Sequence, residues 1–403
     1  MSVYQWNREI PEAGCYDVIV AGGGIAGISA ALAGARNGAK TLLIEREWML
    51  GGLATLGLIA IYLPLCDGYG HQVSFGIAEE LLRLAICRDE PARLALSGWL
   101  KDKDTPEHSG ERRFETEYNP WMFALRAERL LRQNGVDILY GSQIVGADVR
   151  EDRIRAVFAE NKSGCAAYRG KKFIDCSGDA DLCVMAGADT VLFERGNVLA
   201  GWYFGEGNGR NSLHPLGTAD ITEKMESEGI SVPYLSDKRF SGIDGKENSD
   251  MVLLSHTRTL EDIEKAQEKD PLFRPTAVSV IPELRKTRRL NGAATPDSDP
   301  DYRPADCIGV IADWRKRGPC YALPFTALYG NKIHNLAAAG RCISVTDDLW
   351  EYTRVIPACA VTGEAAGTAA AMNGDFGGIS VDGLQNRLIR QGVRLDPERI
   401  SGY

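Results

Sequence analysis

Three glycines near the start of the chain have the spacing of a dinucleotide-binding turn. Gly22, Gly24 and Gly27 form the pattern G-x-G-x-x-G between an apolar run at 17–21 and a segment rich in small residues at 25–37. The first two glycines allow a tight turn and a close approach of the backbone to a pyrophosphate, and the third lets a helix pack closely on a sheet. The helix N-terminus then offers unpaired N–H groups and a positive dipole to the phosphates. This order of elements predicts a dinucleotide site.

An acidic residue follows at the distance expected of a carboxylate that binds ribose. The run at 41–45 predicts a second strand, and Glu45 at its end lies 23 residues after Gly22, close to the usual spacing of about 20. A carboxylate here accepts hydrogen bonds from an unmodified ribose, which disfavours NADP and leaves NAD and FAD as alternatives. A loop that contains Gly51 and Gly52 comes directly afterwards and helps to choose between the two.

The segment 17–55 resembles the FAD-binding start of the glutathione-reductase/fumarate-reductase flavoprotein superfamily, in which a Gly-Gly loop wraps the ribityl chain and the pyrophosphate. Residues 144–173 read as three short strands, similar to the β-meander of this superfamily, and 173–181 is similar to its second FAD-contacting strand and loop. Residues 335–344 and 354–371 resemble its last strand and turn and its closing helix. The chain is identified as a member of the FAD-dependent oxidoreductases of this superfamily.

The resemblance implies FAD as the cofactor and an α/β fold. This fold is a Rossmann-type doubly wound FAD-binding domain built from discontinuous segments, with a three-stranded β-meander and an inserted α+β substrate domain. We expect the FAD-binding domain in residues 1–60, 119–190 and 305–403, and the substrate or cap domain in 61–118 and 191–304. The residues expected to bind FAD are Gly22, Gly24, Ile25, Ala26, Gly27, Glu45, Arg46, Gly52, Leu53, Ala54, Thr55, Ile144, Ser177, Gly178, Asp179, Gly340, Arg341, Val355 and Ile356.

Three residues are candidates for a direct part in the reaction. His71 follows a glycine-rich loop and fits a general base or a covalent link to the flavin, although a hydrogen-bonded structural histidine is the plainer reading. Arg288, in the basic run 285–289, and Arg354, before the closing helix, fit the binding of a carboxylate, and ion pairs within the protein are their alternative. Cys66 lies near His71, and we read it as a packed thiol.

Cysteine spacing and charge exclude several classes of protein. The closest two of the ten cysteines are seven residues apart, so we expect no metal site and no redox-active cysteine pair of a disulfide reductase. The net charge of −9 disfavours nucleic acid as a partner. The glycines of 205–209 lack a following helix and acid, so we expect a loop there and no second dinucleotide domain.

The chain is expected to be cytoplasmic. Residues 18–35 carry no charge over 18 positions, which approaches the length of a membrane span. The division of this segment into strand, turn and helix argues against a span. The scattered thiols and a start without a basic-then-apolar signal fit a reducing cytoplasm.

These observations predict an FAD-dependent oxidoreductase that transfers a hydride or electrons between a small organic substrate and N5 of the flavin. The arginines favour a substrate that carries a carboxylate. One alternative is a fumarate-reductase-like reductase of an activated double bond, with Arg288 or Arg354 as proton donor. Another is a flavoprotein subunit of a larger complex. The expected partners are the substrate and an electron acceptor or donor whose identity stays open, as does a homo-oligomer.

Overall fold

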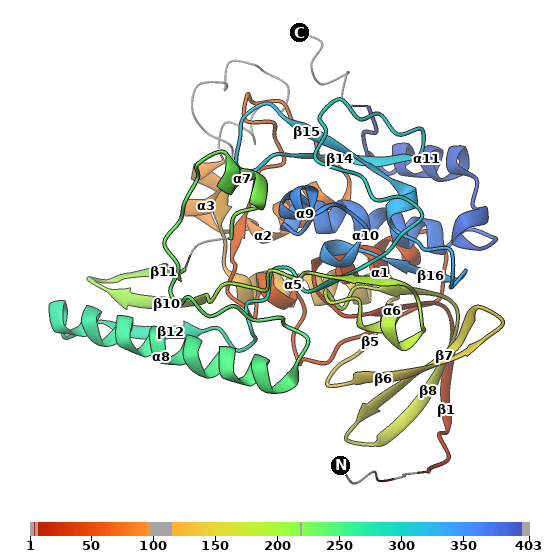
Figure 1. Cartoon of the computed structure of the whole chain (residues 1–403), viewed down its shortest axis with the longest axis horizontal. Coiled ribbons are helices and arrows are strands. Elements are labelled where there is room, and N and C mark those ends of the chain that lie inside the picture. Colours follow the sequence, from red (N-terminus) through yellow and green to blue (C-terminus); the bar gives the residue numbers. More distant parts are fainter. Residues whose placement is uncertain (1–3, 5–6, 97–114, 218–219, 397–403) are drawn as a thin grey trace.

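The computed structural model describes residue 4 and residues 7–96, 115–217 and 220–396. The largest sheet has seven strands, and β1, β6, β7 and β8 of it are labelled at the lower right of Figure 1. Its strand order is β5-β2-β1-β8-β7-β6, with β16 also paired to β8. The pairings among β5, β2, β1, β8 and β16 are parallel, whereas β6, β7 and β8 form an antiparallel meander. These strands are β1 (Glu12–Ala21), β2 (Thr41–Ile44), β5 (Asp137–Leu139), β6 (Gln143–Arg150), β7 (Arg153–Asn161), β8 (Gly164–Asp175) and β16 (Leu336–Ala338).

Alternate side chains of β1 cover the two faces of the sheet. Val18 and Val20 pack into the core that contains the helices α1 (Ile25–Arg36) and α10 (Ile356–Ala370). Ile19 and Ala21 pack on the other face, with residues of the meander and of α6 (Asp181–Met185). All four side chains are buried. A strand that is apolar on both faces is what a parallel sheet covered on both sides requires.

The helices α1 and α10 touch through their backbones. A Cβ atom at Gly363 would lie 2.3 Å from the carbonyl oxygen of Ala26, and one at Gly367 would lie 2.1 Å from that of Ala30. Neither distance is compatible with a side chain, so the contact depends on glycine at both positions. Because α10 packs in this way, its N-terminus comes to the same part of the molecule as the N-terminus of α1.

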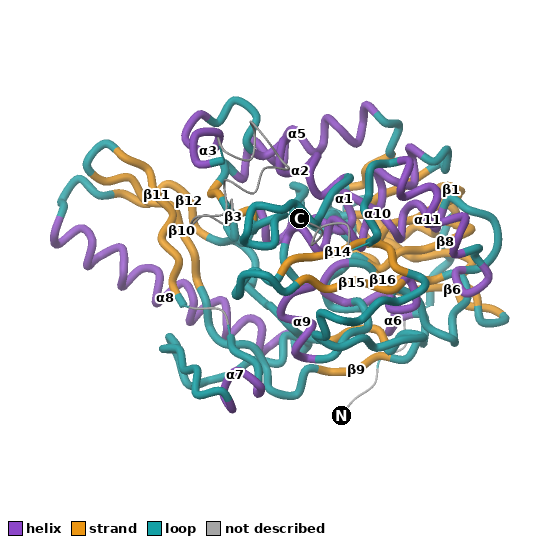
Figure 2. Tube along the Cα trace, turned by 90° about the horizontal axis from the view of Figure 1, so that it is seen from above, coloured by secondary structure: helices purple, strands orange, loops and turns teal. Residues whose placement is uncertain are grey.

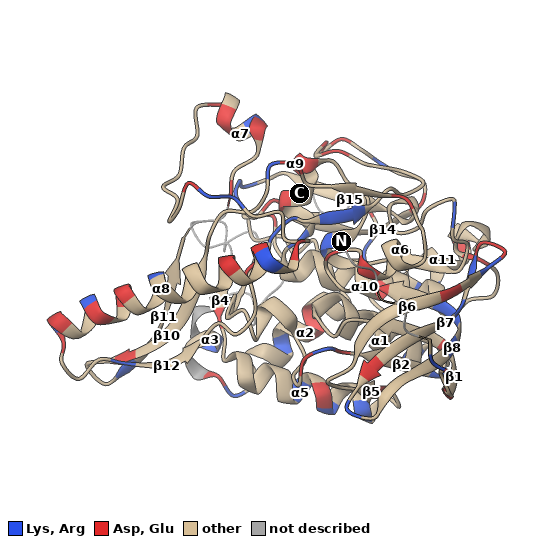
Figure 3. Ribbon diagram, turned by 60° about the horizontal axis from the view of Figure 1, so that its bottom comes forward, with Lys and Arg blue, Asp and Glu red and all other residues tan. Residues whose placement is uncertain are grey.

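A second, smaller sheet projects from one end of the molecule (Figures 1 and 2). It consists of β10 (Gly201–Gly207), β11 (Arg210–Leu216) and β12 (Arg274–Val278), with β10 in the middle. The long helix α8 (Gly245–Lys269) packs against it through Ile263, and acidic and basic side chains both occur along this helix (Figure 3). We call these four elements the arm.

The remaining elements belong neither to the seven-stranded sheet nor to the arm. The other strands form three two-stranded pairs. They are β3 (Ile61–Tyr62) with β4 (Thr116–Glu117), β9 (Thr190–Leu192) with β13 (Arg288–Leu290), and β14 (Cys307–Ala312) with β15 (Cys320–Pro324). The other helices are α2 (Ile77–Ala85), α3 (Glu90–Ala95), α5 (Pro120–Gln133), α7 (Glu223–Ser227), α9 (Asp347–Thr353) and α11 (Val381–Arg390). The short 3₁₀ helices are η1 (Gly52–Ala54), η3 (Phe325–Ala327), η4 (Gly340–Cys342) and η5 (Phe376–Gly378).

The fold class expected from the sequence is confirmed, and one local prediction is wrong. The segment 205–209 is the end of a β-hairpin and not a plain loop. Asn208 and Gly209 both have positive φ, +50° and +71°, as a tight hairpin turn requires. The expected domain boundaries stay a prediction, and 97–114 of the expected substrate domain lie outside the described residues.

Two features, a membrane-spanning helix and a metal-binding group of side chains, are absent from the part of the chain that the structure describes. No helix there combines the length and the apolar character that crossing a bilayer requires. The same residues contain no group of three or more His, Cys, Asp or Glu side chains that could hold a metal ion.

The contact between α1 and α10 predicts a large effect of one methyl group. Gly367→Ala is expected to lower the free energy of unfolding by about 1–3 kcal/mol, because the new Cβ forces the helices apart. Urea denaturation of the FAD-loaded protein measures this change. The control is Gly245→Ala at the exposed start of α8, where a Cβ would meet no atom within 4 Å. Equal stability of the two variants would show that the helices separate at no cost.

A buried carboxylate of α10 holds the start of α2. Glu364 is 2% exposed, and its Oε2 accepts a hydrogen bond of 2.7 Å from the backbone N–H of Ile77, the first residue of α2. Burial raises the pKa of Glu364 to about 8. An acid whose pKa is raised by folding binds its proton more tightly in the folded state, so it makes the protein less stable as the pH rises from its ordinary pKa towards 8.

Glu364→Gln is therefore expected to gain stability relative to the natural chain as the pH rises. The glutamine mimics the protonated acid and can still accept the hydrogen bond from Ile77. Between pH 5 and pH 8 the difference in unfolding free energy is expected to grow by on the order of 3 kcal/mol, at about 1.4 kcal/mol for each pKa unit. Thermal unfolding across this range measures it, with the exposed Glu264→Gln on α8 as control. A difference that stays constant with pH would contradict the prediction.

Candidate active site

A cavity of about 600 Å³ lies beside the carboxyl ends of β1 and β2. This volume is within the range of cofactor and ligand pockets. Its lining comes from the glycine turn before α1, the ends of β2 and β8, the N-terminus of α10, and segments of the inserted region 191–304. Ligands bind at this edge of open α/β sheets as a rule.

The glycine turn is shaped to receive a phosphate. Gly22 has φ +99°, and a Cβ there would lie 2.6 Å from the carbonyl oxygen of Cys176. Gly24 lines the cavity, and a Cβ there would meet no protein atom within 4 Å, so a side chain would enter the open space. α1 begins at Ile25 without any side-chain cap, which leaves its first N–H groups available. These features fit the pyrophosphate of FAD.

Glu45 lies in the cavity lining with acceptor capacity to spare. Its Oε2 accepts a hydrogen bond from the backbone N–H of Gly23, and its Oε1 accepts one of 2.8 Å from that of Glu47. Burial raises the pKa of Glu45 above its ordinary value. Each carboxylate oxygen can accept a further hydrogen bond, so Glu45 fits the ribose hydroxyls. Ile144 and Arg46 line the cavity next to it.

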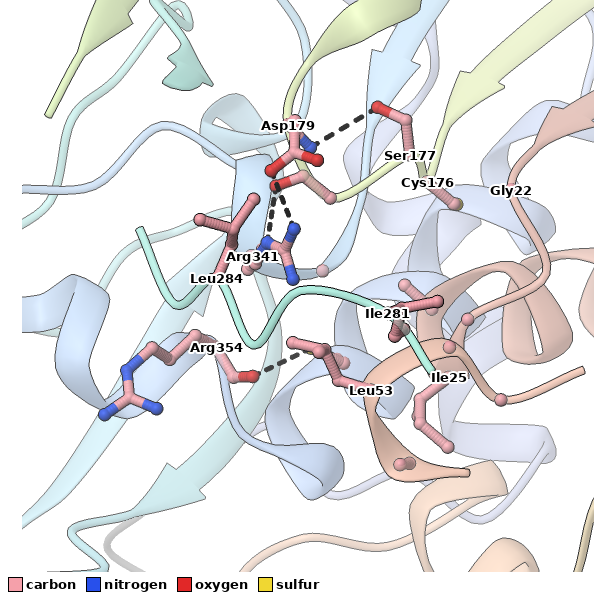
Figure 4. A pocket seen from close by; sticks show the side chains of 18 of the residues that line it. Gly22, Ile25, Leu53, Cys176, Ser177, Asp179, Ile281, Leu284, Arg341 and Arg354 are labelled. Carbon is pink, nitrogen blue, oxygen red and sulfur yellow. Dashed lines mark hydrogen bonds and ion pairs between the residues drawn. The ribbon is translucent and has the colours of Figure 1, made fainter. Parts of the chain in front are cut away.

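The loop after β8 is fixed by an arginine from η4. Arg341 donates hydrogen bonds of 2.7 Å to the backbone oxygen of Gly178 and to Oδ1 of Asp179 (Figure 4). The hydroxyl of Thr287 donates another to the same carboxylate oxygen, at 2.6 Å. Ser177 and both loop residues line the cavity, so this loop is held in place before any ligand arrives.

The inserted region and the residues around it supply the rest of the lining. Ile59, Ile61 and Leu63 alternate along the chain after η1, and all three line the cavity. We call the further residues Trp202, Ile281, Leu284, Arg285, Trp314 and Arg315 the cap-side lining. In Figure 4 the segment with Ile281 and Leu284 passes in front of the α1 and α10 region.

A buried carboxylate links the arginines of the cavity. Glu351 is fully buried and accepts hydrogen bonds from Nη2 of Arg315, at 2.7 Å, and Nη2 of Arg354, at 2.6 Å. The Nζ of Lys286 lies 3.7 Å from it. Burial alone would raise the pKa of Glu351, but Arg354, Lys286 and Arg315 hold it below its ordinary value. Glu351 is therefore a buried anion shared by three cations.

Arg285 has its own buried carboxylate. Its Nη2 lies 3.2 Å from Oε2 of Glu283, and its guanidinium lies over the ring of Trp202 at 5.7 Å. Burial lowers the pKa of Arg285 to about 10, and the positive charge of Arg354 adds to this effect. Burial also raises the pKa of Glu283 to about 7. The arginine and its carboxylate are both desolvated.

Two of the three candidate catalytic residues lie elsewhere. His71 does not line the cavity, and its Nδ1 lies 2.9 Å from Oδ2 of Asp67. Arg288 does not line it either, because its Nε bonds to the backbone of Asp179 and its Nη2 bonds to Asp181, at 2.9 and 2.7 Å. These contacts support the structural roles given above as alternatives. They are a hydrogen-bonded histidine for His71 and an ion pair within the protein for Arg288. Arg354 does line the cavity.

Most residues expected to bind FAD line the cavity, with two exceptions. Gly27 lies against the carbonyl oxygen of Gly22, where a Cβ would be 1.8 Å away. Thr55 is buried and donates its hydroxyl to the backbone of Leu50, at 2.7 Å. Both residues lie behind the lining and support it through contacts with Gly22 and Leu50. Cys66 is buried as expected, and burial raises the pKa of its thiol well above the ordinary value.

Several lining residues were missed at the level of sequence. The basic run 285–289 pointed to Arg285, but Arg288 was preferred. Glu351 precedes Arg354 by three residues, one helical turn, and this spacing was an available signal for their pairing. Trp202, Trp314 and Arg315 had no comparable local signal.

The chain matches the family model described as FAD dependent oxidoreductase over residues 17–198 and 301–388. It belongs to this family. The protein is therefore an FAD-dependent oxidoreductase, and the glycine turn, Glu45 and the open helix ends fit that cofactor.

A curated relative is the tRNA uridine 5-carboxymethylaminomethyl modification enzyme MnmG of Bacillus licheniformis, which is 33% identical over 136 residues. The match covers 31% of this chain and 21% of MnmG, so it spans about a fifth of that enzyme's length.

Three solved structures are similar to this chain at low identity. One is p-nitrophenol 4-monooxygenase of Pseudomonas putida, with 13% identity, TM-score 0.46, and coverage of 93% of this chain and 84% of that one. Another is L-proline dehydrogenase of P. horikoshii, with 11% identity, TM-score 0.43, and coverage of 89% and 94%. A third is a geranylgeranyl bacteriochlorophyll reductase-like protein of Thermoplasma acidophilum, with 13% identity, TM-score 0.44, and coverage of 94% and 82%.

Alanine substitutions at two positions of the glycine turn are expected to change different properties. One changes FAD binding and the other changes the stability of the apoprotein. Gly24→Ala is expected to weaken FAD binding by roughly tenfold or more, because its methyl group occupies the space of the pyrophosphate. The stability of its apoprotein should stay within about 0.5 kcal/mol of the natural chain. Gly22→Ala should destabilise the apoprotein itself, since its φ of +99° and the contact with Cys176 exclude a Cβ. Fluorescence titration with FAD and urea denaturation of the apoproteins separate the two. Unchanged FAD affinity in Gly24→Ala would argue against this position for the pyrophosphate.

Proposed function

We propose that this oxidoreductase passes a hydride between a small organic substrate and N5 of its FAD, which supplies the redox chemistry. The observation that carries the proposal is the cap-side lining. The cavity does not end at the residues that fit FAD but continues to Trp202, Arg285 and Trp314, which none of the FAD-binding motifs includes. The cap-side lining, called the wall below, is suited to a second molecule.

The residues of this wall have two roles in the proposed reaction. The apolar side chains Ile281, Leu284 and Trp202 exclude water from the substrate, which strengthens every charge interaction in the cavity. Arg285 and Arg354 attract an anionic group and orient the substrate through hydrogen bonds of fixed geometry.

Turnover also needs a second redox partner. The described residues that resemble a second glycine pattern, 205–209, lie in the hairpin of the arm, and this argues against a separate nicotinamide domain there. We propose that oxygen, a quinone, an electron-transfer protein or a second organic molecule exchanges electrons with the flavin.

The second candidate function is the reduction of an activated double bond. Arg354 favours it, because this arginine lies directly before the N-terminus of α10 and lines the cavity. In this direction a proton must reach a substrate carbon, and Nη1 of Arg354, which makes no hydrogen bond within the described part of the chain, is available to deliver it.

Anaerobic visible spectroscopy of the purified holoprotein tests both candidates. If the first is right, one or more members of a panel of hydroxy acids and amino acids will bleach the flavin without any nicotinamide. If the second is right, the dithionite-reduced protein will regain its colour with α,β-unsaturated acids, and Arg354→Lys will slow this step more than it weakens binding. A holoprotein that responds to neither panel, but is reduced by NADH or NADPH, would overturn the proposed function.

A further inference from the structure

Two of the cavity arginines keep unused hydrogen-bond donors. Arg285 bonds through Nη2 to Glu283, and Arg354 bonds through Nε and Nη2 to Glu351. Within the described residues, Nε and Nη1 of Arg285 and Nη1 of Arg354 make no hydrogen bond. None of the three belongs to the described buried atoms that lack a partner. These atoms therefore keep some accessible surface, and both arginines line the cavity.

The cations behind the wall are held by ion pairs with buried carboxylates. Arg285 pairs with Glu283, while Arg315, Arg354 and Lys286 all pair with Glu351. Four cations thus meet two buried carboxylates. A buried charge that is not compensated is costly, and the lowered pKa of Arg285 is a sign of that cost. An anion that enters the cavity would reduce it.

Apolar surface surrounds these charges. Two tryptophans each carry a stacked arginine, Trp202 with Arg285 at 5.7 Å and Trp314 with Arg315 at 4.3 Å. The other apolar residues of this part of the lining are Ile59, Ile61, Leu63, Val232, Ile281 and Leu284. A small, fully polar acid would leave this surface in contact with water, whereas a bulky apolar body would cover it.

We infer that Arg285 and Arg354 together bind the carboxylate of the substrate, and that the apolar part of the wall binds an aromatic or branched aliphatic body. The substrate class is therefore an organic acid with a bulky apolar side group. This inference rests on the proposed function, because it names the substrate of that reaction.

Glu283 and Glu351 act as positioning residues in this arrangement. Each is about 1% exposed or less and bonds to an arginine that faces the cavity. Glu283 also accepts a hydrogen bond of 2.7 Å from the backbone N–H of Trp202, so it fixes the arginine and the ring beneath it together. Without these carboxylates the two arginines would repel each other away from a common ligand.

Binding of simple acids to the oxidised holoprotein tests the inference without any turnover. The probes are phenylacetate, the uncharged phenylacetamide and the small acid acetate, followed by calorimetry and by changes in the flavin absorbance. Phenylacetate is expected to bind about tenfold or more tightly than either of the others, since it alone offers both the charge and the ring.

Variants then assign the effect to the two arginines. Arg285→Met and Arg354→Met are each expected to weaken phenylacetate binding by about tenfold or more and to leave phenylacetamide nearly unchanged. Lys316→Met is the matched control, because its side chain is 55% exposed and pairs with Glu228 outside the cavity. FAD content and thermal unfolding establish that each variant is folded. Arg285→Lys, which keeps the charge but loses the planar fork, is expected to fall between Met and the natural residue.

Each result has a definite consequence. If phenylacetamide binds as tightly as phenylacetate, the carboxylate site is wrong, and if acetate does so, the apolar site is wrong. An equal loss in Lys316→Met would also overturn the assignment. If the acids bind as expected but no organic substrate exchanges electrons with the flavin, the proposed function fails while the site stands. If a neutral substrate bleaches the flavin and the acids do not bind, the carboxylate site is wrong while the proposed function stands.

Discussion

The close approach of α1 and α10 is the constraint on which the rest of the site depends. Gly363 and Gly367 lie against the backbone of Ala26 and Ala30 with no room for a side chain. Because the two helices touch along this line, their N-termini, at Ile25 and Ile356, open onto one cavity. A single elongated ligand can therefore meet two positive helix ends. The abundance of glycine and alanine in both helices follows from this geometry.

The charges behind the cavity wall are arranged for binding and not for stability. Burying ions is costly, and buried ion pairs often stabilise a fold less than apolar side chains of the same size would. Here Glu351 and Glu283 are buried with four cations around them, and three of the cations, Arg285, Arg315 and Arg354, line the cavity. The low polarity of the surroundings makes each remaining donor more effective. The cluster therefore supports the proposed binding of an anionic substrate.

The FAD-binding part of the site could be predicted from sequence because its requirements are local. A turn that needs glycine at Gly22, and an acid at the end of the next strand at Glu45, leave a pattern that spacing alone shows. The cap-side lining could not be predicted in this way. Arg285 and Arg288 are three residues apart in one basic run, yet one faces the cavity and the other is bonded to the loop after β8. The direction of a side chain near a short strand depends on tertiary packing.

Two other differences between expectation and structure have different causes. His71 follows a flexible glycine sequence that looked suited to a reacting group, but Asp67, four residues earlier, holds its ring. From the sequence alone, this pairing was one of several contacts that a histidine in a loop could make. The hairpin at Asn208 and Gly209 did carry a local signal, because this residue pair favours positive φ at both positions.

The arm and the cavity wall share the strand β10. β10, the central strand of the arm, begins one residue before Trp202, whose ring lies in the cavity and whose backbone is tied to Glu283. The next residue, Tyr203, is packed in the arm and bonds to Asp262 of α8 at 2.8 Å. A force on the far end of the arm would thus be carried along a hydrogen-bonded strand to the ring on which Arg285 rests. The projecting sheet and the pocket are therefore linked through consecutive residues of one strand.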